Sequence, residues 1–110
     1  MQKLNIALIA VTSLVLASSA AFADDASREA LMKDSKCNKC HAVDKKKDGP
    51  AYKETAAKYK GKADAEQKLY THLTTGPTIK IDGAEEKHAI IKSKDEAAIK
   101  EVVTWILGQQ

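Results

Sequence analysis

Two cysteines and a histidine form the stretch of the chain with the clearest chemistry, Cys37-Asn38-Lys39-Cys40-His41. A Cys-x-x-Cys-His sequence is typical of the attachment site of a c-type haem. One helical turn would bring the two sulfurs to the same face, from which both can reach the vinyl groups of one porphyrin. His41 would then lie beneath the ring as the proximal ligand of iron. The spacing predicts one covalent haem, held by Cys37 and Cys40.

The first 23 residues have the pattern of a secretory signal peptide. Met1-Gln2-Lys3 is positive, an apolar run follows, and Ala21-Phe22-Ala23 matches an A-x-A cleavage site. Because the apolar run is short for a membrane span, we expect cleavage and not a retained anchor. We therefore predict a signal peptide over residues 1–23, a mature domain over residues 24–110, and a location in the periplasm. We expect no membrane span in the mature chain.

Size and charge limit what the mature domain can be. Of the 110 residues, removal of the first 23 leaves 87, with 17 basic and 15 acidic side chains. Because both cysteines are committed to haem, no disulfide remains, and the porphyrin itself is expected to fill the core. The lysines are interpreted as a solvated surface that steers the protein toward acidic partners. No basic block with interleaved aromatic residues appears, so nucleic-acid binding is not predicted.

Apolar residues recur at helical spacing in four stretches, which predicts helices over residues 24–36, 52–60, 64–74 and 94–107. Gly61 and Gly76 are expected to end the second and third of these helices. The stretch 75–86 contains Pro77 and Gly83 and is expected to be irregular. No strand is predicted. The predicted fold class is therefore all-α.

The order of these features resembles that of the class I cytochromes c of the short bacterial periplasmic kind. The likeness covers nearly all of the mature chain and includes the loop Gly49-Pro50-Ala51-Tyr52-Lys53 and a C-terminal helix with Trp105. It implies a small cytochrome c fold, with about four helices around one covalently attached haem. It also implies that Trp105 packs against the first helix and that the Pro50 carbonyl accepts a hydrogen bond from Nδ1–H of His41. That bond would leave Nε2 for iron and make the imidazole more electron-donating.

The sequence departs from this family at the sixth ligand of iron. Family members usually supply a methionine from the loop before the last helix, but this chain has only Met32 beyond the signal peptide. Met32 precedes the haem motif on the proximal helix and is predicted to fill the core. Alignment with the family places His88 at the methionine position. We therefore predict bis-histidine ligation by His41 and His88, with His72 in the third helix or an open site as the alternatives.

These features predict a one-electron shuttle between periplasmic or membrane-bound redox proteins, and not an enzyme. A second imidazole donates more strongly than a thioether, so we expect a reduction potential below that of methionine-ligated relatives. The alternative function is a haem module that binds a small gas or senses redox state through a labile sixth ligand. A monomer or a weak dimer is expected. The candidate donors to the haem propionates are Tyr70, Thr78 and Lys80.

Overall fold

The computed structural model describes residues 20–110, with side chains from residue 25 onward. Its elements are α1 (Ala20–Asp34), α2 (Cys37–Cys40), α3 (Tyr52–Tyr59), α4 (Ala65–Thr75), β1 (Thr78–Ile81), β2 (Ala84–Lys87) and α5 (Glu96–Leu107). The all-α prediction is confirmed in outline, because helices dominate and the one sheet in this range is a short hairpin. Residues 1–19 of the predicted signal peptide lie outside the described residues, and its cleavage stays a prediction. Within residues 20–110, no helix is long and apolar enough to span a bilayer.

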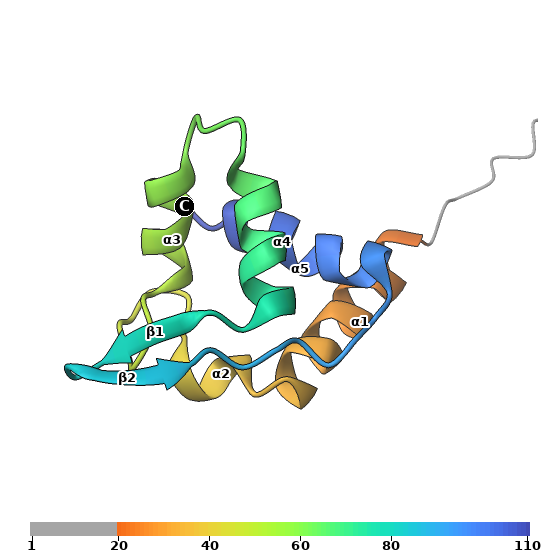
Figure 1. Cartoon of the computed structure of the whole chain (residues 1–110). Helices are drawn as coiled ribbons and strands as arrows, with labels where there is room; N and C mark the ends of the chain where they lie inside the picture. Colours follow the sequence, from red (N-terminus) through yellow and green to blue (C-terminus); the bar gives the residue numbers. More distant parts are fainter. Residues whose placement is uncertain (1–19) are drawn as a thin grey trace, which may run out of the picture.

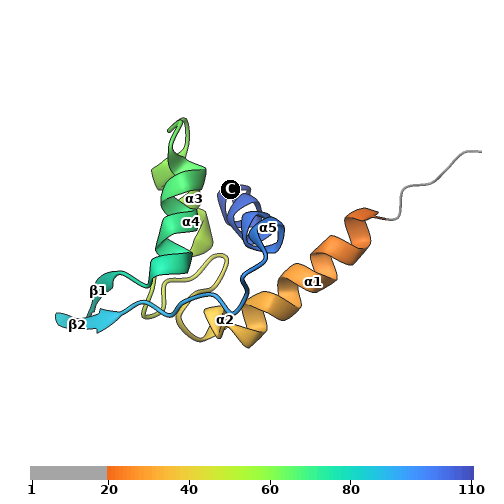
Figure 2. The same ribbon diagram turned by 45° about the vertical axis from the view of Figure 1, so that its right-hand side comes forward.

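Helix α5 is the centre of the packing (Figures 1 and 2). It contacts α3 and α4 on one side and α1 on another. Its apolar residues recur every three or four positions, so one face of the helix is buried. Ile99, Val102 and Val103 on that face are almost fully enclosed. The helix begins after Asp95, whose carboxylate accepts a hydrogen bond from the Ala97 amide at 3.0 Å.

A buried arginine joins α1 to α5. The guanidinium of Arg28 lies 4.5 Å from the ring centre of Trp105, in a cation–π contact. The same group donates to the sulfur of Met32 at 3.8 Å. Met32 lies in the hydrophobic core, as predicted. Trp105 therefore packs against the first helix, and its ring also meets Tyr52 edge-on at 5.2 Å.

A β-hairpin occupies part of the stretch that was expected to be irregular, and this expectation was wrong. Strands β1 and β2 pair antiparallel, from Thr78 opposite Lys87 to Ile81 opposite Ala84. Asp82 and Gly83 link the strands with φ angles of 49° and 83°. Positive φ at both positions matches a two-residue type I′ turn, whose twist suits paired strands. The Asp-Gly pair after an alternating Thr-Ile-Lys-Ile segment was the sequence signal for this hairpin.

The first helix differs from the prediction at both ends, and the structure separates it from the haem motif. Helix α1 starts at Ala20 and ends at Asp34, before the expected end at residue 36. Lys36 takes a left-handed conformation with φ of 60°, which a continuous α-helix cannot contain. The Cys-x-x-Cys segment then forms the separate single turn α2. This break changes the direction of the chain just before Cys37.

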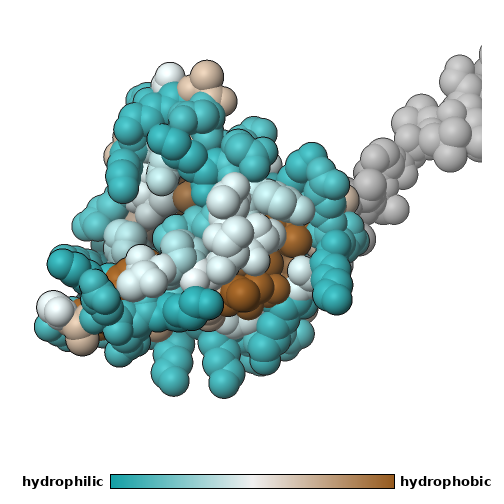
Figure 3. All heavy atoms as spheres, viewed as in Figure 1, coloured by the Kyte–Doolittle hydropathy of each residue, from teal (hydrophilic) through white to brown (hydrophobic). Residues whose placement is uncertain are grey.

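The surface seen in Figure 3 is mostly hydrophilic, with its hydrophobic side chains gathered in small patches. Ile90 is the one large hydrophobic side chain in the described range that is exposed, at 53%. It belongs to the segment between β2 and α5. That segment is held to α4, because the Ile91 amide donates to the Leu73 carbonyl at 2.9 Å.

Gly76 allows this segment to approach the end of α4. Its φ of 58° is in the left-handed region, which helix ends commonly use with glycine. A Cβ atom on Gly76 would lie 2.7 Å from the carbonyl oxygen of His88 and 2.8 Å from Cγ1 of Ile90. Backbone lies on one side of this contact and cannot move aside as a flexible side chain can. Gly76 therefore determines how close the His88 segment comes to α4.

We predict that Gly76→Ala destabilises the protein more than Gly61→Ala does. Both glycines have positive φ, so each substitution introduces strain of about 1 kcal/mol. Gly61 has nothing within 4 Å of the added Cβ, whereas Gly76 meets the His88 backbone. The clash should add about 1–3 kcal/mol at Gly76 alone. Chemical denaturation of the two variants measures the difference, and equal losses would contradict the close approach described above.

Candidate functional site

Helix α2 places both cysteines at one cavity. Cys37 and Cys40 are one turn apart and line the cavity together, and both are partly buried. The start of this turn is held from the far end of the chain. The hydroxyl of the buried Ser35 accepts a hydrogen bond from the amide of Lys92 at 2.9 Å. The cysteine side of the cavity is thereby tied to the segment that precedes α5.

His41 directly follows α2 and is held by the loop that precedes α3. Its Nδ1 lies 2.7 Å from the carbonyl oxygen of Pro50, so Nδ1–H donates and Nε2 is left free. The ring stacks on Tyr52, with centres 5.3 Å apart. Gly49 packs against the same ring so closely that a Cβ would lie 2.3 Å from Cε1 of His41. Three neighbouring residues therefore define the position of this imidazole.

His88 lies across the cavity from His41, just after β2. Its amide donates to the Pro77 carbonyl at 2.9 Å, which anchors the backbone beside the end of α4. Its Nδ1 lies 2.8 Å from the carbonyl oxygen of Ala89, so this ring too can keep Nε2 free. Burial lowers the pKa of His88, which favours the neutral form that binds a metal.

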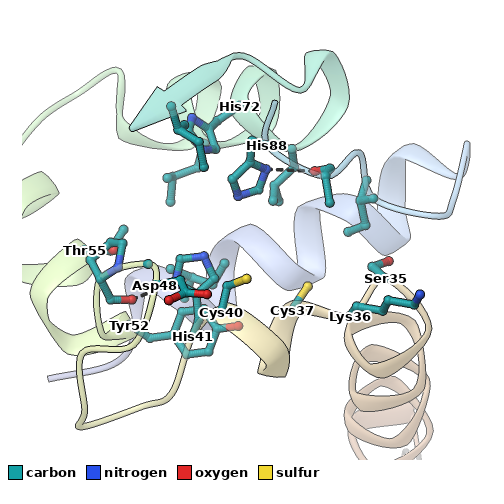
Figure 4. Close-up of a pocket in the computed structure, with 18 of the residues that line it drawn as sticks. Ser35, Lys36, Cys37, Cys40, His41, Asp48, Tyr52, Thr55, His72 and His88 are labelled. Atoms are coloured by element: carbon teal, nitrogen blue, oxygen red, sulfur yellow. Dashed lines mark hydrogen bonds between the residues drawn. The ribbon is translucent and has the colours of Figure 1, made fainter. Parts of the chain in front are cut away.

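His72 points to the same side of the cavity from α4 (Figure 4). Its ring centre lies 4.3 Å from that of His88, with the two planes at 65°, which is an edge-to-face contact. Burial lowers the pKa of His72 as well. The structure therefore brings both histidines that the sequence left as candidates to one side of the cavity, opposite His41 and the cysteines.

The cavity between these groups has a volume of about 510 Å³, within the range of small-molecule and cofactor sites. Helices α3, α4 and α5, the hairpin and the segment before α5 all contribute to its wall. Most of the surface of that wall is apolar. The large hydrophobic residues that line it are Tyr52, Tyr59, Leu69, Leu73, Ile79, Ile81, Ile91, Val102 and Ile106.

The residues present fit a haem with two imidazole ligands. A metal–imidazole bond of about 2 Å, plus about 1 Å from nitrogen to ring centre, would separate two such rings by about 6 Å. The ring centres of His41 and His88 are 6.2 Å apart, with the planes at 43°. Tyr52 also lines the cavity, and its ring stacks on that of His41.

The structure separates the three residues predicted as propionate donors. Lys80 lines the cavity, but Thr78 and Tyr70 do not. Tyr70 instead lines a shallow depression on the surface, beside Ile90. Thr55 and Lys58 of α3 line the cavity and were not predicted from the sequence. No local pattern distinguishes these two side chains, because the rotation of α3 against α5 decides which of its polar residues face inward.

Comparison with known protein families gives a match over most of the chain. The family model described as Cytochrome c matches residues 28–110. Cytochrome c-551 of Pseudomonas aeruginosa is 38% identical over 82 residues, which cover 74% of this chain and 76% of that protein. Cytochrome c-551 of Allochromatium vinosum is 38% identical over 79 residues, covering 71% of this chain and 81% of that protein.

Solved structures give the same result. The Class 1 cytochrome MtoD from Sideroxydans lithotrophicus ES-1 superposes with a TM-score of 0.74 at 50% identity, covering 78% of this chain and 96% of that one. Wild-type cytochrome c552 of Nitrosomonas europaea gives a TM-score of 0.61 at 30% identity, covering 74% of this chain and 99% of that one.

We predict that Gly49→Ala displaces the ring of His41. Gly49 lacks positive φ, so the effect is steric: the added Cβ would overlap the imidazole. The ring must move, and its hydrogen bond to Pro50 should weaken or break. The reduction potential and the absorption spectrum of the haem-loaded variant measure this change. Gly108→Ala, with its nearest contact at 3.4 Å, is the matched control and should leave both unchanged. An unaltered potential in Gly49→Ala would contradict this close packing.

Proposed function

The chain belongs to the cytochrome c family, and from this premise we propose that it is a periplasmic electron shuttle with bis-histidine ligation and a lowered reduction potential. As a small class I c-type cytochrome it carries one covalently bound haem c. It is an electron carrier and not an enzyme. Cys37 and Cys40 would hold the haem covalently, with His41 and His88 as the two axial ligands of iron.

One observation carries the choice of ligands, namely that His41 and His88 face each other with ring centres 6.2 Å apart. No other pair of candidate side chains in the described range offers this arrangement. Met32 is buried in the core and does not line the cavity. His72 is near, but it contacts His88 edge-on and does not stand opposite His41 in such a pair. His88 is therefore the side chain best placed to be the sixth ligand.

The backbone determines which nitrogen each imidazole presents. Nδ1–H of His41 donates to Pro50, and Nδ1–H of His88 donates to the carbonyl of Ala89. Both Nε2 atoms are then free to bind metal. Each carbonyl also draws the Nδ1 proton, which makes the ring a stronger donor. Two such donors stabilise the ferric form, and this supports the lowered potential.

The bound haem supplies a single iron that gains and loses one electron. The chain keeps that iron in one environment in both states. Apolar walls from α4 and α5 exclude water, and Leu69, Leu73 and Val102 among them are buried. Because the two ligands come from anchored segments, little rearrangement should accompany electron transfer. This favours rapid one-electron exchange over chemistry on a bound substrate.

The partners would be periplasmic or membrane-bound redox proteins, met through weak contacts as a monomer or weak dimer. Residues 1–23 begin with a positive charge, continue with an apolar run and end in an Ala-x-Ala sequence, and this pattern supports export. N-terminal sequencing of the purified holoprotein checks this proposal. A mature chain beginning at Asp24 is expected, and a chain that keeps the first 23 residues would contradict it.

We predict that His88→Ala converts the ferric iron from low spin to high spin. Removal of the imidazole leaves the sixth position to water or open, whereas the neighbouring Lys87→Ala should keep the low-spin state. Low-temperature EPR of the two haem-loaded variants measures the outcome. The ferrous His88→Ala protein should also bind carbon monoxide readily, while the wild type should bind it slowly.

Two results would overturn this proposal. A low-spin signal in His88→Ala identical to that of the wild type would show that another group is the sixth ligand. A high-spin wild type that binds carbon monoxide at once would favour the gas-binding or sensing module over the closed electron shuttle.

A further inference from the structure

We propose that His72 is a positioning residue for His88, and that it sets the angle between the planes of the two axial imidazoles. This inference rests on the proposed ligation by His41 and His88. The observation behind it is the edge-to-face contact of the two rings, with centres 4.3 Å apart and planes at 65°. Figure 4 shows His72 beside His88, on the side of the cavity that lies across from His41.

The two axial imidazoles are held in different ways. His41 is fixed by Pro50 and Gly49 on one loop and by stacking on Tyr52 of α3. The ring of His88 has its hydrogen bond to Ala89, the next residue in the chain. The backbone of this loop is tied to the end of α4 by the amides of His88 and Ile91, but the ring itself has no hydrogen bond outside the loop in the described range. His88 therefore needs a contact from another element.

His72 supplies that contact from a firm position. It lies on α4 beside Leu73 and one turn from Leu69, and both leucines are buried. The carbonyl of Leu73, the residue after His72, accepts a hydrogen bond from the amide of Ile91. This bond fixes the segment that follows His88 to α4. The two rings are thus carried by backbones that are already tied together. Their edge-to-face contact can then limit rotation of the His88 ring relative to α4.

Packing, and not hydrogen bonding, is the basis of this role. Neither ring nitrogen of His72 makes a hydrogen bond to a side chain or carbonyl in the described range. By contrast, Nδ1 of His41 and Nδ1 of His88 each have a carbonyl partner. The edge of any aromatic ring of similar size should therefore position His88 as well. Phenylalanine keeps the ring and removes the nitrogens, and alanine removes both.

The angle between the axial planes is a property that spectroscopy can read. The planes of His41 and His88 are now 43° apart. Imidazole orientation determines how the iron d orbitals that hold the unpaired electron split, and the g values of the low-spin ferric state follow this splitting. Groups that orient a metal ligand are known to tune the metal in this way. If His72 is removed, the ring of His88 can rotate, so the angle should change and its distribution should widen.

The experiment compares His72→Ala, His72→Phe and the control Thr71→Ala in the haem-loaded protein. Thr71 is the exposed neighbour on the same helix. We expect His72→Ala to remain low spin with shifted and broadened g values, a changed reduction potential and faster carbon monoxide binding. His72→Phe and Thr71→Ala should retain the wild-type g values. The absorption spectrum and circular dichroism of each variant establish that it is folded, and His72→Phe remains informative if His72→Ala fails to fold.

Three outcomes would overturn the inference. They are unchanged g values in His72→Ala, a His72→Phe protein whose g values match a folded His72→Ala, and a high-spin His72→Ala, which would make His72 the ligand itself. Failure of the ligation proposal looks different, because there His88→Ala keeps the wild-type low-spin signal. The two sets of variants therefore separate a wrong positioning residue from a wrong ligand.

Discussion

The separation of His41 and His88 is the constraint on which the rest of the structure depends. Their ring centres lie 6.2 Å apart, yet α3, α4 and the hairpin intervene between them in the chain. Two distant segments must therefore meet across a cavity at a distance that a single metal ion can bridge. The carbonyl of Pro50 holds the first imidazole, and the carbonyl of Pro77, just after α4, holds the backbone of His88. Helix α5 packs behind both sides and relates them to each other.

The same constraint explains the two glycines with close neighbours. Gly49 lets the backbone lie against the ring of His41, and Gly76 lets the His88 segment lie against the end of α4. A side chain at either position would change the distance between the imidazoles. The small domain has no disulfide to resist such a change, since both of its cysteines line the cavity. Haem bound in this cavity would therefore stabilise the fold as well as serve the function.

Features with local causes could be predicted from the sequence. The Cys-x-x-Cys-His motif, the four main helices and the burial of Met32 follow from spacing and periodicity, and the structure agrees within a few residues at most helix ends. The position of His88 opposite His41 came from the family resemblance. Pro77 and Gly83 favour an irregular segment, but Asp82-Gly83 is also a local turn signal, and the hairpin follows from that signal.

Features that depend on how helices rotate against each other could not be predicted. Tyr70 and His72 are two residues apart on α4, so they project from different faces, and only the packing shows that His72 faces the cavity. The same is true of Thr55 and Lys58 on α3. The contact between His72 and His88 needs the chain after the hairpin to return to the end of α4, which no helical periodicity reports. Tertiary packing therefore decides which polar side chains reach the haem site.

Near-infrared magnetic circular dichroism of the wild-type ferric protein tests the central claim most directly. The energy of the ligand-to-iron charge-transfer band depends on the pair of axial ligands, and it needs no variant that could disturb the fold. The account predicts a band at the energy of two neutral imidazoles. A band at the energy of imidazole with amine or thioether, or a high-spin spectrum, would contradict the pairing of His41 with His88.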